Sequence, residues 1–194
     1  MQMPLDAMND VPDDVLLLRY ADGDSRAAHA LTLRLVPVVM AHAYRLLGNR
    51  AEAEDVAQEA MLRLWRIAPD WRLGEAKVTT WLYRVVANLC VDRLRRPRGV
   101  ALDQVAEPED DAASVEEDMQ NGQRRRALQA ALGRLPDRQR EAVILRHIEG
   151  LANPEIAEIM GIGVEAVESL TARGKRALAS DLGARRAELG YSDD

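Results

Sequence analysis

Apolar residues return every three or four positions along most of the chain. Between Asp13 and Leu47 this helical spacing is interrupted only at Asp22-Gly23-Asp24. The pattern predicts two helices joined by a turn, the second bent near Pro37 and closed by Gly48-Asn49.

Two further helices are predicted before residue 100. One runs from Glu52 to about Ile67, and the other runs from Thr79 to Arg95, with Pro97 just beyond its end. A loop containing Pro69 and Gly74 separates them. The spacing and these helix breakers predict a bundle of helices in the first half of the chain.

The last third, LPDRQREAVILRHIEGLANPEIAEIMGIGVEAVESLTARGKRAL, predicts a helix, a short turn and a second helix. We expect Asn153 to cap a helix whose first residue is Pro154, and Gly161 and Gly163 to form the turn. The second helix should begin near Val164. Its expected inward residues are Val167, Leu170 and Leu178, and its expected outward residues are Arg173, Lys175 and Arg176. This is the spacing of a DNA-binding helix-turn-helix, although an ordinary pair of antiparallel helices has the same pattern.

Composition favours an all-α protein. The chain has 194 residues, no Phe and few alternating runs of Val, Ile and Thr, whereas Ala, Leu, Arg and Glu are abundant. A chain of this length forms one medium domain or two small ones. We therefore expect helices with little or no β-structure.

Charge is distributed very unevenly. The formal net charge is −6, which taken alone argues against a nucleic-acid binder. From Arg63 to Arg98 there are nine basic residues against three acidic ones, whereas Gly99 to Gln123 holds eight acidic residues and no basic one. The sequence therefore predicts a basic surface followed by an acidic, flexible connector.

The sequence offers no metal or redox chemistry. Cys90 is the single cysteine and lies in an apolar helical pattern, so a packed thiol in a reducing cytoplasm is the expectation. The three histidines have no metal-ligand spacing with Cys90, and no glycine-rich loop is built to hold phosphate. The N-terminus is acidic, and no apolar run approaches transmembrane length by inspection. We expect a soluble cytoplasmic protein without metal or cofactor.

Two of the predicted helices have, besides the apolar face expected in the core, a second face whose composition suggests a function. In the helix from Glu52 to Ile67, one face is apolar (Val56, Ala60, Leu64 and Ile67) and the other is polar (Glu52, Asp55, Gln58, Glu59 and Arg63). The polar face is either a partner surface or simply solvated.

The helix from Thr79 to Arg95 combines aromatic and basic side chains. Its expected buried stripe is Leu82, Val85, Val86, Leu89 and Leu94, which leaves Trp81, Arg84, Asn88, Arg95 and Arg96 for other surfaces. Aromatic rings beside bases suit the binding of unstacked nucleotides, although Trp81 or Tyr83 taken singly is more often a core residue.

These motifs together resemble a known family. The segments EDVAQEAMLRLW, TTWLYRVVANLCVDRLRR and LPDRQREAVILRHIEGLANPEIAEIMGI look like conserved regions 2 and 4 of the extracytoplasmic-function (group 4) sigma factors, in the family's order and separation. The resemblance implies two small helical domains on a flexible acidic linker. It also implies a dissociable promoter-specificity subunit of bacterial RNA polymerase with no catalytic site of its own. The implied divisions are residues 1–98 for region 2, 99–119 for the linker and 120–194 for region 4.

The resemblance also implies roles for individual residues. The implied contacts to core polymerase are Asp55, Gln58, Glu59, Leu62 and Trp65. The implied contacts to the −10 element are Lys77, Trp81, Tyr83, Arg84, Asn88, Asp92, Arg93, Arg95 and Arg96. The implied contacts to the −35 element are Asn153, Glu155, Glu165, Glu168, Ser169, Arg173, Lys175 and Arg176.

The chain departs from the family pattern at the start of the last helix. Where many members have roughly G-T-V-K-S-R, residues 165–170 are Glu-Ala-Val-Glu-Ser-Leu, so Glu168 and Leu170 replace two basic residues. A glutamate accepts a hydrogen bond from cytosine N4 but is repelled by phosphate. Either the −35 sequence is unusual, or the contact moves to Arg173, Lys175 and Arg176.

The partners implied are core RNA polymerase, promoter DNA and an anti-sigma factor, since family members are commonly held inactive by one. An alternative from another class is a sigma-like module that titrates an anti-sigma protein without directing transcription. The acidic linker is either a soluble tether or a segment that occupies a basic polymerase channel.

Overall fold

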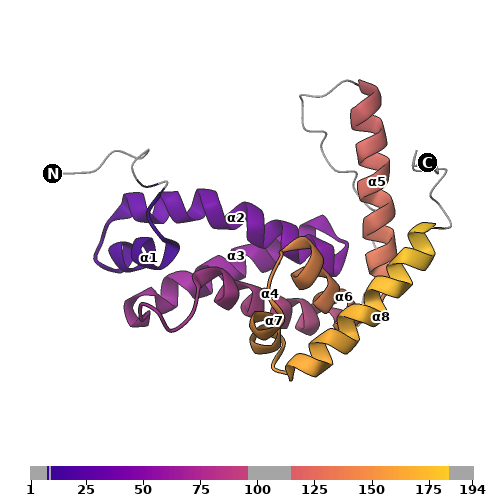
Figure 1. Ribbon diagram of the computed structural model, residues 1–194. Helices are drawn as coiled ribbons and strands as arrows, with labels where there is room; N and C mark the ends of the chain where they lie inside the picture. The colour runs from indigo at the N-terminus through magenta and orange to yellow at the C-terminus, as the bar shows by residue number, and fades with distance from the viewer. Residues whose placement is uncertain (1–7, 9, 96–114, 184–194) are drawn as a thin grey trace. The chain divides into compact units, whose positions relative to one another are not determined.

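The computed structural model describes residue 8, residues 10–95 and residues 115–183 (Figure 1). The described residues form helices and turns, with no strand among them, so the prediction of an all-α fold is confirmed. The chain divides into two compact units, residues 1–44 with 51–97 and residues 45–50 with 98–194. We call them the N-terminal and C-terminal units. Arg96 and the acidic segment up to residue 114 lie outside the described residues.

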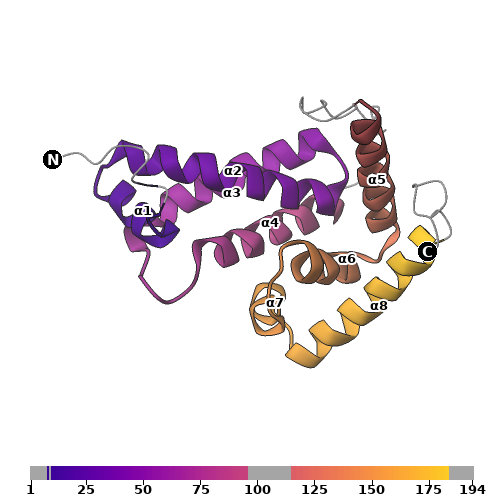
Figure 2. The same ribbon diagram turned by 45° about the horizontal axis from the view of Figure 1, so that its top comes forward.

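The N-terminal unit is built from the helices predicted for the first half of the chain. They are α1 (Asp13–Ala21), α2 (Ser25–Leu47), α3 (Arg50–Ile67), the 3-10 turn η2 (Ala68–Asp70) and α4 (Val78–Arg95). In Figures 1 and 2, α2, α3 and α4 lie side by side. Helix α2 continues through Pro37, and Gly23 and Gly48 have positive φ where the chain turns before α2 and after it.

Each helix of this unit gives one apolar stripe to a common core. The fully buried members are Leu16 and Leu17 of α1, Leu31 and Leu35 of α2, Val56, Ala60 and Leu64 of α3, and Leu82 and Val86 of α4. Burying a side chain of this size stabilises a fold by about 1.5–3 kcal/mol. Arg34 fastens the start of the chain to α2, because its Nη1 donates to Val11 O at 2.7 Å and to Asp13 Oδ1 at 2.9 Å.

Helix α2 corrects one expectation from the sequence. By length and composition alone it could span a membrane, with a mean hydropathy of 1.3 over its most apolar window. However, 44% of that window is buried inside the protein. Its apolar residues pack against the neighbouring helices, as the burial of Leu31, Leu35 and Val39 shows. Part of the apolar surface of α2 therefore belongs to the core of this unit.

The C-terminal unit contains the predicted helix-turn-helix. Its elements are α5 (Val115–Arg134), α6 (Asp137–Val143), the π-helical turn η3 (Ile144–Ile148), α7 (Asn153–Met160) and α8 (Val164–Gly183). Helix α8 packs against α5, α6 and α7. Helix α5 begins at Val115, within the last residues of the stretch 99–119 that the resemblance implied to be the linker. Glu, Met and Gln in this stretch are good helix formers in spite of its charge.

Two glycines determine how α8 is placed. Gly161 ends α7 in the left-handed conformation, with φ of 62°, and the Ile162 N–H donates to Ala157 O at 3.0 Å. Gly174 lies where α8 crosses α6: a Cβ there would be 2.5 Å from Val143 Cγ2 and 3.2 Å from Gln139 O. Only glycine allows so close an approach of the two helices.

Candidate functional site

The polar face of α3 is exposed, as the sequence predicted. Asp55, Gln58 and Leu62 are exposed, and Leu62 keeps 42% of its surface accessible although it is apolar. Glu59 and Trp65 are half-buried, and the Trp65 ring packs 4.7 Å from that of Tyr20 in α1. We call Asp55, Gln58, Glu59, Leu62 and Trp65 the α3 face.

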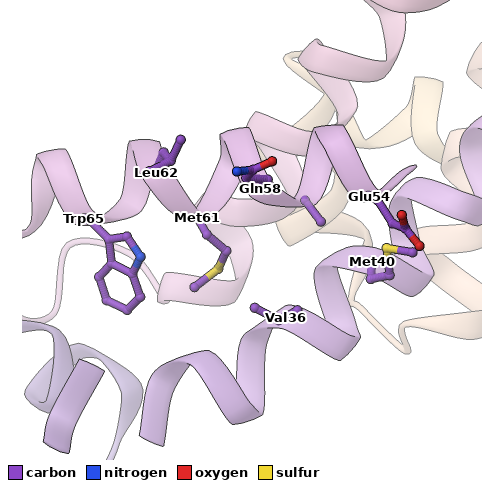
Figure 3. A pocket seen from close by; sticks show the side chains of 8 residues that line it. Val36, Met40, Glu54, Gln58, Met61, Leu62 and Trp65 are labelled. Atoms are coloured by element: carbon purple, nitrogen blue, oxygen red, sulfur yellow. The ribbon is translucent and has the colours of Figure 1, made fainter. Parts of the chain in front are cut away.

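An apolar cleft borders the α3 face on its α2 side. The cleft has a volume of about 360 Å³, and Figure 3 shows Met61 and Trp65 of α3 facing Val36 and Met40 of α2 across it. Gln58 and Leu62 also line it. Periodicity in the sequence identified α2 as a helix but gave no sign that Val36 and Met40 would form one wall of this cleft.

A second, more polar cleft lies between α3 and α4. It has a volume of about 510 Å³ and is lined by residues of the α3 face together with α4 side chains: Asp55, Gln58, Glu59, Leu62, Arg63, Leu89, Asp92 and Arg93. Within it, Arg63 Nε donates to Glu59 Oε1 at 2.8 Å. This hydrogen bond, together with the positive charge of Arg63, lowers the pKa of the Glu59 carboxyl. The α3 face thus adjoins two clefts.

One side of α4 carries an exposed stripe of basic and polar residues. The stripe consists of Lys77 just before the helix, then Trp81, Arg84, Asn88 and Arg95, with the exposed, acidic Asp92 between the last two, at spacings of three or four positions. Side chains at such spacings lie on one face of a helix. We call this set the α4 stripe. Its aromatic member, Trp81, is half-buried and meets the ring of Trp71 edge to face at 6.2 Å.

Two residues expected on the DNA-contacting surface lie elsewhere. Tyr83 is only 6% exposed and its ring packs 4.7 Å from that of His42, so its expected place at the surface is wrong. Arg93 follows Arg84 by nine positions, about two and a half helical turns, and so lies on the other side of α4. There its Nη1 donates to Asp55 Oδ2 at 3.2 Å. Arg93 therefore joins α4 to the α3 face.

On α8 the buried and exposed sides are clearly separated. Val167 and Gly174 are buried, two turns apart. The opposite side carries Glu165, Ser169, Ala172 and Arg176, all exposed. Arg173 Nε donates to Ser169 O at 3.2 Å and its Nη2 donates to Ser169 Oγ at 3.0 Å, while Arg176 Nε donates to Ala172 O at 3.3 Å. Both arginines thus lie along the outer side of the helix.

Lys175 extends toward a different neighbour from the two arginines of α8. It is exposed, and its charge acts on His147 in the π-helical turn η3. Burial, followed by the positive charges of Lys175 and Arg146, lowers the pKa of the His147 imidazole.

The start of α7 differs from the prediction. Ala152, not Asn153, is the N-cap, with extended φ and ψ of −77° and 151°. The Glu155 side chain reaches back and accepts from the Ala152 N–H at 3.0 Å. The Asn153 side chain is thereby left for another partner, and its Nδ2 donates to Glu168 Oε1 of α8 at 3.3 Å.

Metal chemistry has no centre in the described part of the chain. Over those ranges no group of three His, Cys, Asp or Glu side chains is placed to hold a metal ion, and Cys90 is buried.

Comparisons with known proteins identify the class. Residues 31–99 match sigma-70 region 2, and residues 125–178 match sigma-70 region 4. The chain is 35% identical over 158 residues to the ECF RNA polymerase sigma factor SigW of Bacillus subtilis, covering 72% of this chain and 80% of SigW. The chain belongs to the extracytoplasmic-function sigma factors, and it is a promoter-directing subunit of RNA polymerase.

Solved structures support the same fold. CnrH, solved in complex with the cytosolic domain of CnrY, aligns with a TM-score of 0.64 and 27% identity, covering 89% of this chain and 97% of CnrH. The sigma factor RpoE of Bartonella quintana, solved in complex with the anti-sigma factor NepR, aligns with a TM-score of 0.64 and 23% identity, covering 78% of this chain and 94% of RpoE.

Proposed function

We propose that the two units divide the work of promoter recognition. The region around residues 1–98 binds core polymerase and opens the −10 element, and the region from about residue 120 onward contacts the −35 element. The observation that carries the proposal is the joint presence of the α3 face and the α4 stripe on adjacent helices of one unit. A protein that binds polymerase and opens DNA needs both.

The α3 face supplies the contact with core polymerase. It combines two carboxylates, an amide and two large apolar side chains beside an apolar cleft. Interfaces of this kind place an apolar centre within a polar rim. The α3 face is therefore suited to a partner helix that brings basic and apolar side chains.

The α4 stripe supplies the contact with the −10 element. Arg84 and Arg95 attract the phosphates, and Asn88 offers an amide to a base edge. Opening a duplex requires bases to leave the stack, which costs a few kcal/mol and is offset by stacking and edge hydrogen bonds on the protein. Trp81, supported by Trp71, offers the aromatic surface for this.

The outer side of α8 supplies the contact with the −35 element in the major groove. In a helix-turn-helix the second helix enters the groove and its first turns meet the base edges. Glu165 and Ser169 occupy those turns, and Arg173 and Arg176 follow. The α8 helix thus has polar groups where bases lie and cations where phosphates lie.

This role needs no catalytic residue or cofactor in the chain and places the protein in the cytoplasm with the polymerase. We also propose an anti-sigma factor as a regulatory partner. RpoE of Bartonella quintana, which has the same fold, is bound by one in its solved structure.

A run-off assay tests the proposal. The full chain is mixed with bacterial core polymerase and a random duplex library, and bound fragments are selected and then transcribed. We expect a recurrent pair of sequence elements and transcripts that start at a fixed distance from them. Transcription no greater than that of core polymerase alone would instead support a module that only titrates an anti-sigma factor.

Substitution of the α3 face tests the assignment of the polymerase contact. Asp55→Ala with Glu59→Ala should lower the affinity for core polymerase about tenfold or more, because buried polar and charged contacts at interfaces cost 1–3 kcal/mol when lost. The matched control is Asp22→Ala with Glu158→Ala, which removes the same charge from exposed positions outside the α3 face. Equal binding by both double variants would show that the α3 face is merely solvated.

A further inference from the structure

Two of the protein's own carboxylates lie at the start of α7, one on a backbone N–H and one on a side-chain amide. Glu155 accepts from the Ala152 N–H, and Glu168 accepts from the Asn153 side chain. The start of a helix attracts anions because its first N–H groups point outward and the helix dipole is positive there. In a helix-turn-helix the first helix crosses the DNA backbone, so the anion expected at this point is a phosphate.

Glu168 lies on the side of α8 that faces α7, away from the centre of its outer side. It directly follows the buried Val167, whereas Glu165 and Ser169 lie opposite the buried side. The 3.3 Å bond from Asn153 Nδ2 fixes Glu168 Oε1 beside the first residue of α7. Glu168 is therefore better placed to meet the DNA backbone than a base edge.

Glu168 and a DNA phosphate would compete for the same N–H of Asn153. A carboxylate close to a phosphate is repelled, and the repulsion between two unit charges at 4 Å is about 1 kcal/mol even in water. Of the two N–H donors of the Asn153 amide, the one directed at α8 is taken by Glu168, so a phosphate on that side must displace the carboxylate.

We propose that Glu168 is an intramolecular competitor for the −35 backbone: its carboxylate, held by Asn153, takes the place of a DNA phosphate and weakens the upstream contact. The inference rests on the proposed function, since it assumes that α7 and α8 dock on DNA. It adds that this contact is restrained by the protein itself, so that promoter binding depends more heavily on the α4 stripe.

The test uses the full chain with core polymerase and one promoter fragment recovered in the library selection. Glu168→Gln should tighten promoter binding about fivefold, because a neutral amide holds the Asn153 donor less strongly than a carboxylate and no longer repels the phosphate. Glu168→Lys should tighten it further and steepen the salt dependence by about 0.9 in the log–log slope, the value for one added phosphate contact. Glu158→Gln, an equal charge change on the exposed side of α7, is the control and should leave binding unchanged.

A double-mutant cycle separates competition from general repulsion. If Glu168 acts by holding the Asn153 donor, the gain from Glu168→Gln should shrink to less than half in an Asn153→Ala background. A gain of equal size in both backgrounds would overturn the competition mechanism. So would weaker binding by Glu168→Gln confined to fragments with one particular upstream base pair, since that would make Glu168 a base reader.

The same experiments distinguish a failure of this inference from a failure of the proposed function. If the wild-type holoenzyme selects no upstream element at all, α8 does not read DNA. If it selects one and Glu168→Gln binds no tighter, only the competition is refuted.

Discussion

The two helices proposed to meet DNA, α4 and α8, carry their charge differently. Within α4 (Val78–Arg95) there are three basic residues and one acidic residue, whereas α8 (Val164–Gly183) has three of each sign. The α4 stripe adds an aromatic ring, and α8 adds glutamates in its first two turns. If both helices meet DNA as proposed, we expect α4 to hold it by phosphate attraction and stacking, and α8 to rely on hydrogen bonds to base edges with little net attraction to the backbone.

The two helices are also held in place differently. Helix α4 is held in place by large side chains, since Leu82, Tyr83 and Val86 are buried among the neighbouring helices. Helix α8 instead approaches α6 closely at Gly174. Cavities and rotamers can relax around large side chains, but backbone at van der Waals distance cannot. Small changes should therefore disturb α8 more than α4.

The largest expected effect comes from Gly174→Ala. The added Cβ would lie 2.5 Å from Val143 Cγ2, so α8 must move away from α6. We expect the C-terminal unit to lose about 1–3 kcal/mol of stability by overpacking, which exceeds the gain of up to about 1 kcal/mol that Ala offers in a helix. Hydrogen exchange of the full chain should show faster exchange in α6 and α8 and unchanged exchange in α2 to α4.

Gly122→Ala is the matched control for this change. Gly122 lies inside α5, and a Cβ there meets no atom within 4 Å. This variant should be as stable as the wild type or slightly more stable. If Gly174→Ala were equally stable, the close approach of α8 to α6 at Gly174 would not determine the position of α8.

Removing cations from each helix compares the two modes of DNA binding directly. Arg84→Ala with Arg95→Ala should flatten the salt dependence of promoter binding by about two units of slope, one per lost phosphate contact, and weaken binding roughly tenfold at moderate salt. Arg173→Ala with Arg176→Ala should change the slope less, because α8 has as many acidic as basic residues and therefore attracts phosphate weakly. The measurement is holoenzyme binding to one promoter fragment across a salt series.

The control for the α4 pair is Arg93→Ala on the same helix. Arg93 is paired with Asp55 and lies away from the α4 stripe, so the slope should stay the same. A larger change from the α8 pair than from the α4 pair would reverse the comparison and make α8 the main electrostatic contact.

Periodicity predicted the helices well and their surfaces less well. The bounds of α2, α3, α4 and α8 follow from apolar spacing and from glycines such as Gly23, Gly48 and Gly161, because those signals are local. The expectation for Tyr83 was wrong because Trp81 and Tyr83 are both amphipathic, and Tyr83 lies on the buried side of α4 with Leu82 and Val86, beside the ring of His42. Asn153 was misplaced as a cap because Glu155 and Glu168 compete for the groups around it.

The apolar spacing of the sequence could not predict which residues of different helices lie next to one another. Val36 and Met40 look like ordinary core positions of α2, and Gly174 looks like a weak point in α8. Their meaning depends on which helix lies opposite: α3 across the apolar cleft and α6 beneath α8. Arg93 is a similar case, since its long side chain reaches a carboxylate on another helix instead of the stripe beside it.

The smallest expected effect concerns the ion pair between Asp55 and Arg93, which connects α4 to the α3 face. The Arg93 side chain keeps 26% and the Asp55 side chain 66% of its surface accessible, so solvent screens the 3.2 Å contact. A double-mutant cycle with Asp55→Asn and Arg93→Gln, read by thermal unfolding of the full chain, should give a coupling of about 0.2–1 kcal/mol. Such a pair holds a side chain in position more than it stabilises the fold.

Polymerase bound to the α3 face would take Asp55 for its own contacts and release Arg93 into the cleft between α3 and α4. Zero coupling, together with a salt slope that falls by a full unit in Arg93→Ala, would instead assign Arg93 to the DNA-contacting side of α4.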